Sequence, residues 1–159
     1  MGVRHYRRFK ILFRKQMILI SHRGNINGKI PNNENHPEYI DEALHAGFDV
    51  EIDMWWVDGK IYLGHDVPQY EVDDKWLSER IDNLWVHCKN VELLNWIRST
   101  SLHWFWHEED TLTLTSKGQV WVYPGKQPVI GSIAVMPEIH NEDVSKCIGV
   151  CSDVISRYK

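Results

Sequence analysis

The sequence predicts an α/β protein with a parallel sheet, and three observations favour this class. Short apolar segments alternate with helical segments in the order strand, helix, strand, helix, which is typical of parallel strands joined by crossover helices. The chain contains eight candidate strands if the return strand at residues 60–63 is not counted among them. With 159 residues, of which 43% are apolar, the chain is long enough to bury one core.

The first half of the chain contains the clearest elements. Residues 17–21 have the composition of a strand, and residues 25–35, rich in Asn, Gly and Pro, have that of a loop. Helical spacing predicts a helix over 37–46, which Gly47 ends. The elements expected next are a strand over 48–56, a return strand over 60–63 after the Asp58-Gly59 turn, helices over 72–81 and 91–99, and a strand over 84–88.

Strands dominate after residue 100, where they are expected over 102–107, 112–115, 120–123, 132–136 and 149–154. The segments between them are too short for full crossover helices. Residues 111–125 have the pattern of a hairpin, with its turn at Lys117-Gly118. We therefore expect loops or short turns in place of several outer helices.

Charge is divided unevenly along the chain. Residues 1–16 hold six basic side chains and no acidic one, whereas residues 17–159 hold 12 basic and 22 acidic ones. We therefore predict a basic N-terminal arm over 1–16 and a single domain over 17–159. The acidic domain argues against nucleic-acid binding, and no apolar run is long enough for a transmembrane helix. The arm is interpreted as a frayed terminus or as a weak membrane contact.

Cysteine usage bears on the compartment. Cys88, Cys147 and Cys151 are odd in number and form no Cys-x-x-Cys pair. They predict small buried hydrophobes rather than a disulfide framework. This usage is typical of a reduced compartment, so we expect a cytoplasmic protein.

Polar side chains that carry chemistry gather at the ends of the first predicted strands. Glu51 and Asp53 lie two residues apart on one strand, so both project to the same face. Two carboxylates on one face repel unless a cation lies between them, and Mg²⁺ or Ca²⁺ suits oxygen ligands. The other strand ends supply groups that could exchange protons or bind a phosphate, namely His22, Arg23, His65, His87 and Lys89.

Each of these motifs is weak when taken alone. A Glu-x-Asp pair is more often a solvated strand face, and His-Arg-Gly and His-Asp are common in turns. Their order carries more information, because His-Arg-Gly, a helix ended by glycine, Glu-x-Asp, Asp-Gly and His-Asp follow one another within residues 22–66. Chance assembly of this series is improbable.

In this series of motifs the chain resembles the glycerophosphodiester phosphodiesterases, relatives of the phosphatidylinositol-specific phospholipases C. The resemblance rests on HRG at 22–24, NEN at 33–35, AGFDVEIDMWWVDGKIYLGHD at 46–66 and HCK at 87–89, with a weaker similarity in GVCSD at 149–153. The motifs cover residues 17–90. The resemblance implies a (β/α)8 TIM-type barrel with a divalent ion at the carboxyl ends of the strands.

The resemblance also implies roles for individual residues. His22 and His65 would be the general base and the general acid, and Glu51 and Asp53 would ligate the metal. Three further residues would serve the substrate: Arg23 and Lys89 by holding the phosphate and Glu34 by lying near the site. Trp55 is a candidate substrate platform, since it closely follows the acidic pair.

The implied reaction is metal-dependent hydrolysis of a glycerophosphodiester or a related phosphodiester. A substrate hydroxyl attacks phosphorus while one histidine accepts its proton and the other protonates the leaving alcohol, and water then opens the cyclic phosphate. Positive charge near the phosphate stabilises the transition state. The alternative function is that of a catalytically degenerate barrel, which binds a phosphorylated ligand or a protein partner without turnover.

The sequence departs from the family at two places. The family has Glu-x-Lys where this chain has His87-Cys88-Lys89. As a third metal ligand His87 would admit Mn²⁺ or Zn²⁺ besides Mg²⁺ or Ca²⁺, and the alternative is that His87 only bonds to nearby groups. The second departure is length, since such barrels typically need about 200–250 residues. We therefore expect a shortened barrel with several outer helices missing.

The missing helices would leave part of the sheet uncovered. The tryptophan-rich strands that carry Trp104, Trp106 and Trp121 could then be covered by a second subunit, so we expect a homodimer. The alternative is a monomer with the basic arm folded over the gap.

Candidates in the second half are weaker. The acidic run after residue 106 has consecutive side chains that point in different directions, which is unsuited to a single ligand set. Residues that could still contribute to a site or pocket are Trp106, His107, Glu108, Tyr123, Lys126, Glu138 and Asp153.

Overall fold

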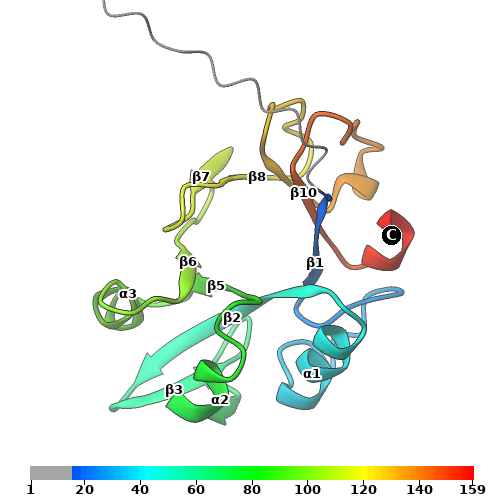
Figure 1. The fold of residues 1–159 in the computed structure, drawn as a ribbon. Helices are drawn as coiled ribbons and strands as arrows, with labels where there is room; N and C mark the ends of the chain where they lie inside the picture. The colour runs from blue at the N-terminus through cyan, green and yellow to red at the C-terminus, as the bar shows by residue number, and fades with distance from the viewer. Residues whose placement is uncertain (1–15) are drawn as a thin grey trace, which may run out of the picture.

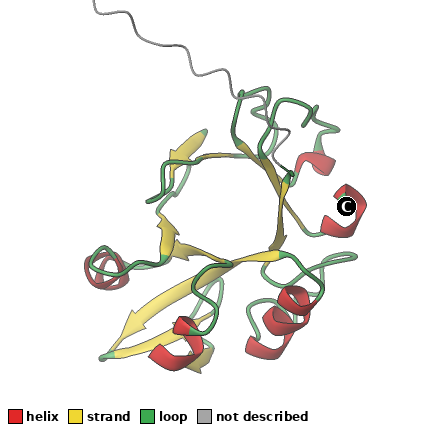
Figure 2. Ribbon diagram, in the orientation of Figure 1, coloured by secondary structure: helices red, strands yellow, loops and turns green. Residues whose placement is uncertain are grey.

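The structure is a computed structural model that describes residues 16–159. The predicted basic arm therefore lies outside the described residues, apart from Gln16. Ten strands form one mixed sheet that curves into a half-barrel, which Figure 1 shows along its axis. The α-helices lie outside this sheet, and they cover its first half (Figure 2).

Seven strands run parallel, in the spatial order β6-β5-β2-β1-β10-β9-β8. Their bounds are β1 (Ile18–His22), β2 (Asp49–Val57), β5 (Leu84–Cys88), β6 (His103–Phe105), β8 (Val120–Val122), β9 (Ile133–Val135) and β10 (Gly149–Ser152). Three antiparallel strands extend the sheet: β3 (Lys60–Leu63) beside β2, β4 (Tyr70–Val72) beside β3, and β7 (Leu112–Leu114) beside β8.

The helical content is small. Residues 16–159 contain the α-helices α1 (Pro37–His45), α2 (Asp74–Ser78) and α3 (Val91–Ile97) and the 3₁₀ turns η1 (Pro137–Ile139) and η2 (Ile155–Tyr158). The side chains of Asp73 and Asn90 accept hydrogen bonds from the first turns of α2 and α3. Gly47, with φ of 87°, follows α1 as predicted. None of these helices has the length and apolar character required to cross a bilayer.

The expected (β/α)8 TIM-type barrel, even in a shortened form, is wrong. The sheet is mixed, three of its strands are antiparallel, and strands outnumber helices by far. One physical reason is the short connection from β8 to β9 over residues 123–132, because a crossover that carries a helix needs a dozen residues or more. The longer segment from β9 to β10 forms only the 3₁₀ turn η1. After α3 the chain returns in short segments, one of which is the predicted hairpin of β7 and β8.

Two apolar clusters lie on opposite faces of the sheet. Val50, Ile52 and Met54 of β2 join the cluster between the sheet and the helices. The interior of the half-barrel holds a second cluster, formed by Ile20, Trp85, Phe105, Trp121, Ile133, Val135 and Cys151. Because side chains alternate along a strand, the odd-numbered residues Glu51 and Asp53 face the interior.

The position of the tryptophans corrects one expectation and leaves another open. Trp121 is only 4% exposed and packs in the interior cluster, so it is not part of an uncovered outer surface. Trp104 and Trp106 are half-buried, and Leu112 and Leu114 of β7 are 47% and 65% exposed. The homodimer stays a prediction.

The buried His103 side chain makes a pH-dependent contribution to stability. Its Nε2 lies 2.8 Å from Thr115 Oγ1, and its ring lies 3.9 Å from the Trp85 ring. Burial, together with the charge of Lys117, lowers the pKa of His103 to about 4. In the unfolded chain the same group titrates near pH 6.5. The unfolded state therefore binds more protons between these values, and stability falls as the pH drops from 6.5 to 4.

We predict that His103→Gln reduces this acid-induced loss of stability, because glutamine keeps a polar group beside Thr115 and does not titrate. Urea unfolding at pH 7 and pH 4.5 measures the loss in each variant. His45→Gln, at an exposed position at the end of α1, is the matched control and leaves the loss unchanged. An equal loss in the His103 variant and the parent would contradict the assignment.

Candidate active site

The register of the parallel strands β1, β2 and β5 places four predicted site residues side by side near the carboxyl ends of these strands. His22 of β1 pairs with Glu51 of β2, and Asp53 of β2 pairs with His87 of β5. His22, Glu51 and His87 line a cavity of about 110 Å³, together with Arg23 and His65. Asp53 is fully buried beside them. The structure thus brings together residues that are far apart in the sequence.

The turn after β1 directs Arg23 into this site. Arg23 has φ of 57° and Gly24 φ of 94°, so both residues adopt the left-handed region. A Cβ atom at Gly24 would lie 2.5 Å from the ring of Tyr39, which belongs to α1. Only glycine therefore allows α1 to pack this closely against the turn.

Asp53 is surrounded by cations and amide donors. Its Oδ2 lies 2.8 Å from Arg23 Nε and accepts a hydrogen bond of 2.9 Å from Asn35 Nδ2. Its Oδ1 lies 3.0 Å from His87 Nδ1 and 3.5 Å from Lys89 Nζ. Burial alone would raise the pKa of Asp53, but the His87 hydrogen bond and the Arg23 and Lys89 charges hold it well below its usual range.

Glu51 has the opposite environment. Burial and the charge of Asp53 raise the pKa of Glu51. Its Oε2 lies 3.8 Å from His22 Nε2, and it is buried without a hydrogen-bond partner. A bound cation would satisfy this oxygen.

Glu51, Asp53 and His87 form a buried group that could hold a metal ion, since one ligand atom from each lies within 4.8 Å of the others. Two carboxylates and an imidazole suit Mn²⁺ or Zn²⁺ as well as Mg²⁺. The ring nitrogens of His87 already face two acceptors, Asp53 Oδ1 at 3.0 Å and the His107 carbonyl at 3.3 Å. If His87 bound a metal ion through one ring nitrogen, the contact that this nitrogen now makes would be broken.

His22 is oriented by Asp153, which follows β10. His22 Nδ1 lies 2.7 Å from Asp153 Oδ1, which leaves Nε2 directed toward Glu51. Burial lowers the pKa of His22, but the hydrogen bond to Asp153 and the charge of Glu51 outweigh it, so the pKa is raised. The sequence had indicated Asp153 only as a residue at a strand end that could touch substrate.

His65 also lines the cavity and has its own carboxylate. Its Nδ1 lies 2.7 Å from Asp66 Oδ1, at an exposed position. Burial and the charge of Arg23 lower the pKa of His65. The predicted substrate platform Trp55 lines neither this cavity nor the one beside it. Trp55 Nε1 instead donates 2.6 Å to the carbonyl of Gly64, next to His65.

Asn25 connects the loop over residues 25–35 to Asp153 through side-chain hydrogen bonds. The sequence alone did not predict this role. Its Nδ2 donates to Glu34 Oε1 at 3.0 Å and to Asp153 Oδ1 at 2.9 Å. Its Oδ1 accepts from the Tyr39 hydroxyl and from the backbone N–H of Ile30. The asparagine-rich composition of the loop was a signal only for turns, because every Asn in it looks alike without the partners.

The remaining predicted residues have supporting positions. Glu34 accepts 3.2 Å from Arg23 Nη1 and lines a second cavity of about 390 Å³, which shares Arg23 and His65 with the first. Lys89 contacts Asp53 but does not line the first cavity. His107 does line it, and its ring stacks on His87 at 4.5 Å.

An aromatic wall closes the first cavity on the side of β6 and β8. Phe105 stacks on His87 at 5.2 Å and on Trp121 at 4.6 Å. Burial and the charge of His87 lower the pKa of His107 to about 4, so this ring is neutral at pH 7. The site therefore combines a charged side, at β1 and β2, with an aromatic side.

Comparison with protein-family models, with curated proteins and with solved structures finds no match to this chain.

We predict that Mn²⁺ raises the thermal stability of the parent protein and not that of Glu51→Gln, because the variant lacks one charged ligand. At a metal concentration one hundred times Kd, binding to the folded state adds about 2.7 kcal/mol. Thermal unfolding with and without Mn²⁺, together with calorimetric titration, measures the effect. Glu71→Gln, on the exposed edge of β4, is the control and should behave as the parent.

We predict that Asn25→Ala lowers the free energy of unfolding by about 2–4 kcal/mol, because it leaves the buried Glu34 and the half-buried Asp153 carboxylates with fewer donors. Urea unfolding measures the change. Asn27→Ala removes a single exposed contact with Ser156, so its effect stays below about 1 kcal/mol. Equal effects of the two substitutions would contradict the role of Asn25.

Proposed function

We propose that this protein hydrolyses a small phosphodiester, such as a glycerophosphodiester, with two histidines in acid–base roles and a divalent metal ion. The observation that carries the proposal is the arrangement of His22 and His65. Both line one cavity, and each is held through Nδ1 by its own carboxylate at 2.7 Å. This arrangement leaves both Nε2 atoms available for proton transfer to a bound substrate.

Arg23 is the residue best suited to bind the phosphate. It lines both cavities, and its ion pairs with Asp53 and Glu34 fix the orientation of the guanidinium group. A guanidinium can donate two parallel hydrogen bonds to a phosphate. A phosphodiester bound at Arg23 would extend one ester arm into each cavity.

The pKa values of the two histidines are shifted in opposite directions. A lowered pKa keeps His65 neutral and able to accept a proton, whereas a raised pKa favours the protonated form of His22. Because Glu51 is both a cause of the raised pKa of His22 and a proposed metal ligand, these directions describe the metal-free site, and we propose the two histidines together as the acid–base pair. Asp153 and Asp66 hold the rings in place during the transfer.

Glu51, Asp53 and His87 are the residues that would hold the metal ion. A divalent ion there would supply positive charge to the non-bridging oxygens of the phosphate. The unpartnered Oε2 of Glu51 supports this assignment.

Binding of a phosphorylated ligand without turnover is the second candidate function. One observation favours it: the charge of Asp53 is already balanced by Arg23, His87 and Lys89. A metal ion would have to compete with these groups for the carboxylate. In that case the cationic side chains would bind the phosphate directly.

We predict that the parent protein with Mg²⁺ or Mn²⁺ hydrolyses glycerophosphocholine or bis(p-nitrophenyl) phosphate, and that His22→Ala and His65→Ala each lower kcat by about 10²–10⁴-fold. Release of the alcohol measures the rate. His45→Ala is the matched control at an exposed histidine and keeps the parent rate. If no metal and no substrate give a rate above that of the His22 variant, catalysis is excluded and the binding function remains.

A further inference from the structure

A further cavity of about 560 Å³ lies on the outer side of the half-barrel and shares only Pro124 with the candidate active-site cavity. Its volume is within the range of about 300–1,000 Å³ that is typical of small-molecule sites. It is formed by two loops, one from β8 to β9 and one after η1. The lining residues are Pro124, Gly125, Lys126, Gln127, Pro128, His140, Glu142, Asp143 and Lys146.

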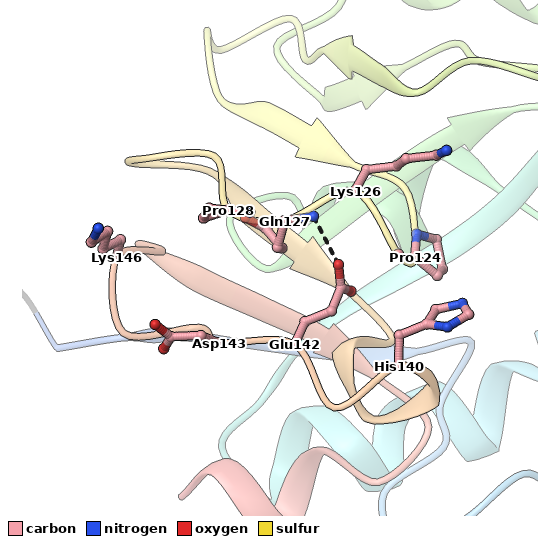
Figure 3. A pocket seen from close by; sticks show the side chains of 9 residues that line it. Pro124, Lys126, Gln127, Pro128, His140, Glu142, Asp143 and Lys146 are labelled. Atoms are coloured by element: carbon pink, nitrogen blue, oxygen red, sulfur yellow. Dashed lines mark hydrogen bonds between the residues drawn. The ribbon is translucent and has the colours of Figure 1, made fainter.

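These loops occupy the place where helices of a regular α/β sheet would pack. Direct contacts hold them together, as Figure 3 shows for the bond between Gln127 and Glu142. The ring of His140 packs against Gly125 so closely that a Cβ atom there would lie 3.1 Å from His140 Cδ2. The walls of the cavity are therefore defined by specific contacts rather than by loose loops.

Glu142 is an incompletely satisfied acceptor in this cavity. Its Oε1 accepts a 2.8 Å hydrogen bond from the backbone N–H of Gln127. Its Oε2 is buried and has no partner. The neighbouring Asp143 accepts a 2.9 Å hydrogen bond from the Ser145 N–H through Oδ1. The middle of the cavity thus carries negative charge that a cationic donor would satisfy.

The two lysines of the cavity, Lys126 and Lys146, and the His140 ring also lack ion-pair partners among the described residues. Among the ion pairs in residues 16–159, none within 4.0 Å involves Lys126, His140 or Lys146. In Figure 3 Lys126 and His140 lie at one end of the cavity, Glu142 lies in the middle, and Lys146 lies beside Asp143 at the other end. Lys126 is therefore separated from Glu142 along the cavity, whereas Lys146 and Asp143 lie together at the far end.

We propose that this cavity binds a small zwitterion that carries an ammonium group and a phosphate or carboxylate group. Lys126 and His140 would bind the anionic group, and Glu142 would bind the ammonium group. A simple anion would be repelled by the negative charge of Glu142. A simple cation would be repelled by the positive charge of Lys126. A ligand with both charges satisfies both ends, so it binds more tightly than either fragment.

The test compares three probes by NMR titration of the full chain: O-phosphoethanolamine, inorganic phosphate and ethanolamine. The backbone amide of Gln127 reports on Glu142 directly, because it donates to that carboxylate. The His140 ring reports on the anionic end. His22 and His65 report separately on the candidate active site. We expect O-phosphoethanolamine to shift Gln127 and His140 at lower concentration than either fragment does.

Two variants test the ammonium contact and the anion contact separately. Glu142→Gln keeps an oxygen acceptor for the Gln127 amide and removes the charge, so it weakens O-phosphoethanolamine about tenfold and does not weaken phosphate. Lys126→Ala weakens both probes that carry phosphate. Lys117→Ala, an exposed lysine in the β7–β8 turn that does not line this cavity, changes neither.

Other outcomes overturn the proposal. Phosphate that binds as tightly as the zwitterion would indicate a plain anion site, and ethanolamine that does so would indicate a cation site. Shifts confined to His22 and His65, or no shift at Gln127 and His140, would show that the cavity does not bind this class of ligand. Each of these results is independent of whether the active site turns over a phosphodiester.

Discussion

Removing a carboxylate from water costs several kcal/mol unless cations and hydrogen-bond donors replace the solvent, and Asp53 is where this constraint acts most strongly. The side chain is fully buried in the middle of β2, where the pairing with β5 nears its end. Its partners come from three other segments: Arg23 from the turn after β1, Asn35 from the loop before α1, and His87 and Lys89 from the end of β5. Breaking one contact leaves an uncompensated charge, so these segments are held in one arrangement.

The alternation of side chains along β2 makes this burial compatible with a stable sheet. Val50, Ile52 and Met54 enter the apolar cluster under the helices, while the acidic residues between them face the interior. Below the site, the interior is filled by aromatic and aliphatic side chains. The charged groups are therefore confined to the carboxyl ends of the strands, where loops can reach them. The antiparallel strands β3 and β4 continue from the second half of β2, and β7 lies beside β8, so they leave this arrangement unchanged.

The same site creates different environments for chemically similar groups. Glu51 and Asp53 are both buried, yet the pKa of the first is raised by burial and that of the second is lowered by its cationic neighbours. His22 and His65 are both paired with an aspartate, yet burial beside Arg23 lowers the pKa of His65 while Asp153 and Glu51 raise that of His22. Groups whose pKa values are pushed in opposite directions are common in acid–base catalysis, and they also occur in structural ion-pair networks.

Local patterns in the sequence by themselves determined the strand that carries Glu51 and Asp53, the helix that Gly47 ends, the Asp58-Gly59 turn and the hairpin of β7 and β8, because each depends on neighbouring residues. The sequence also grouped the residues of the metal-capable site. Only the tertiary structure decided that the sheet is a mixed half-barrel, because closure depends on connections in residues 98–159 that contain no α-helix. It also decided that Asp153 orients His22 and that Asn25 joins Glu34 to Asp153. The contacts of Asp153 with His22 and Asn25 join residues more than a hundred positions apart, and no local pattern records which strand end will lie beside another.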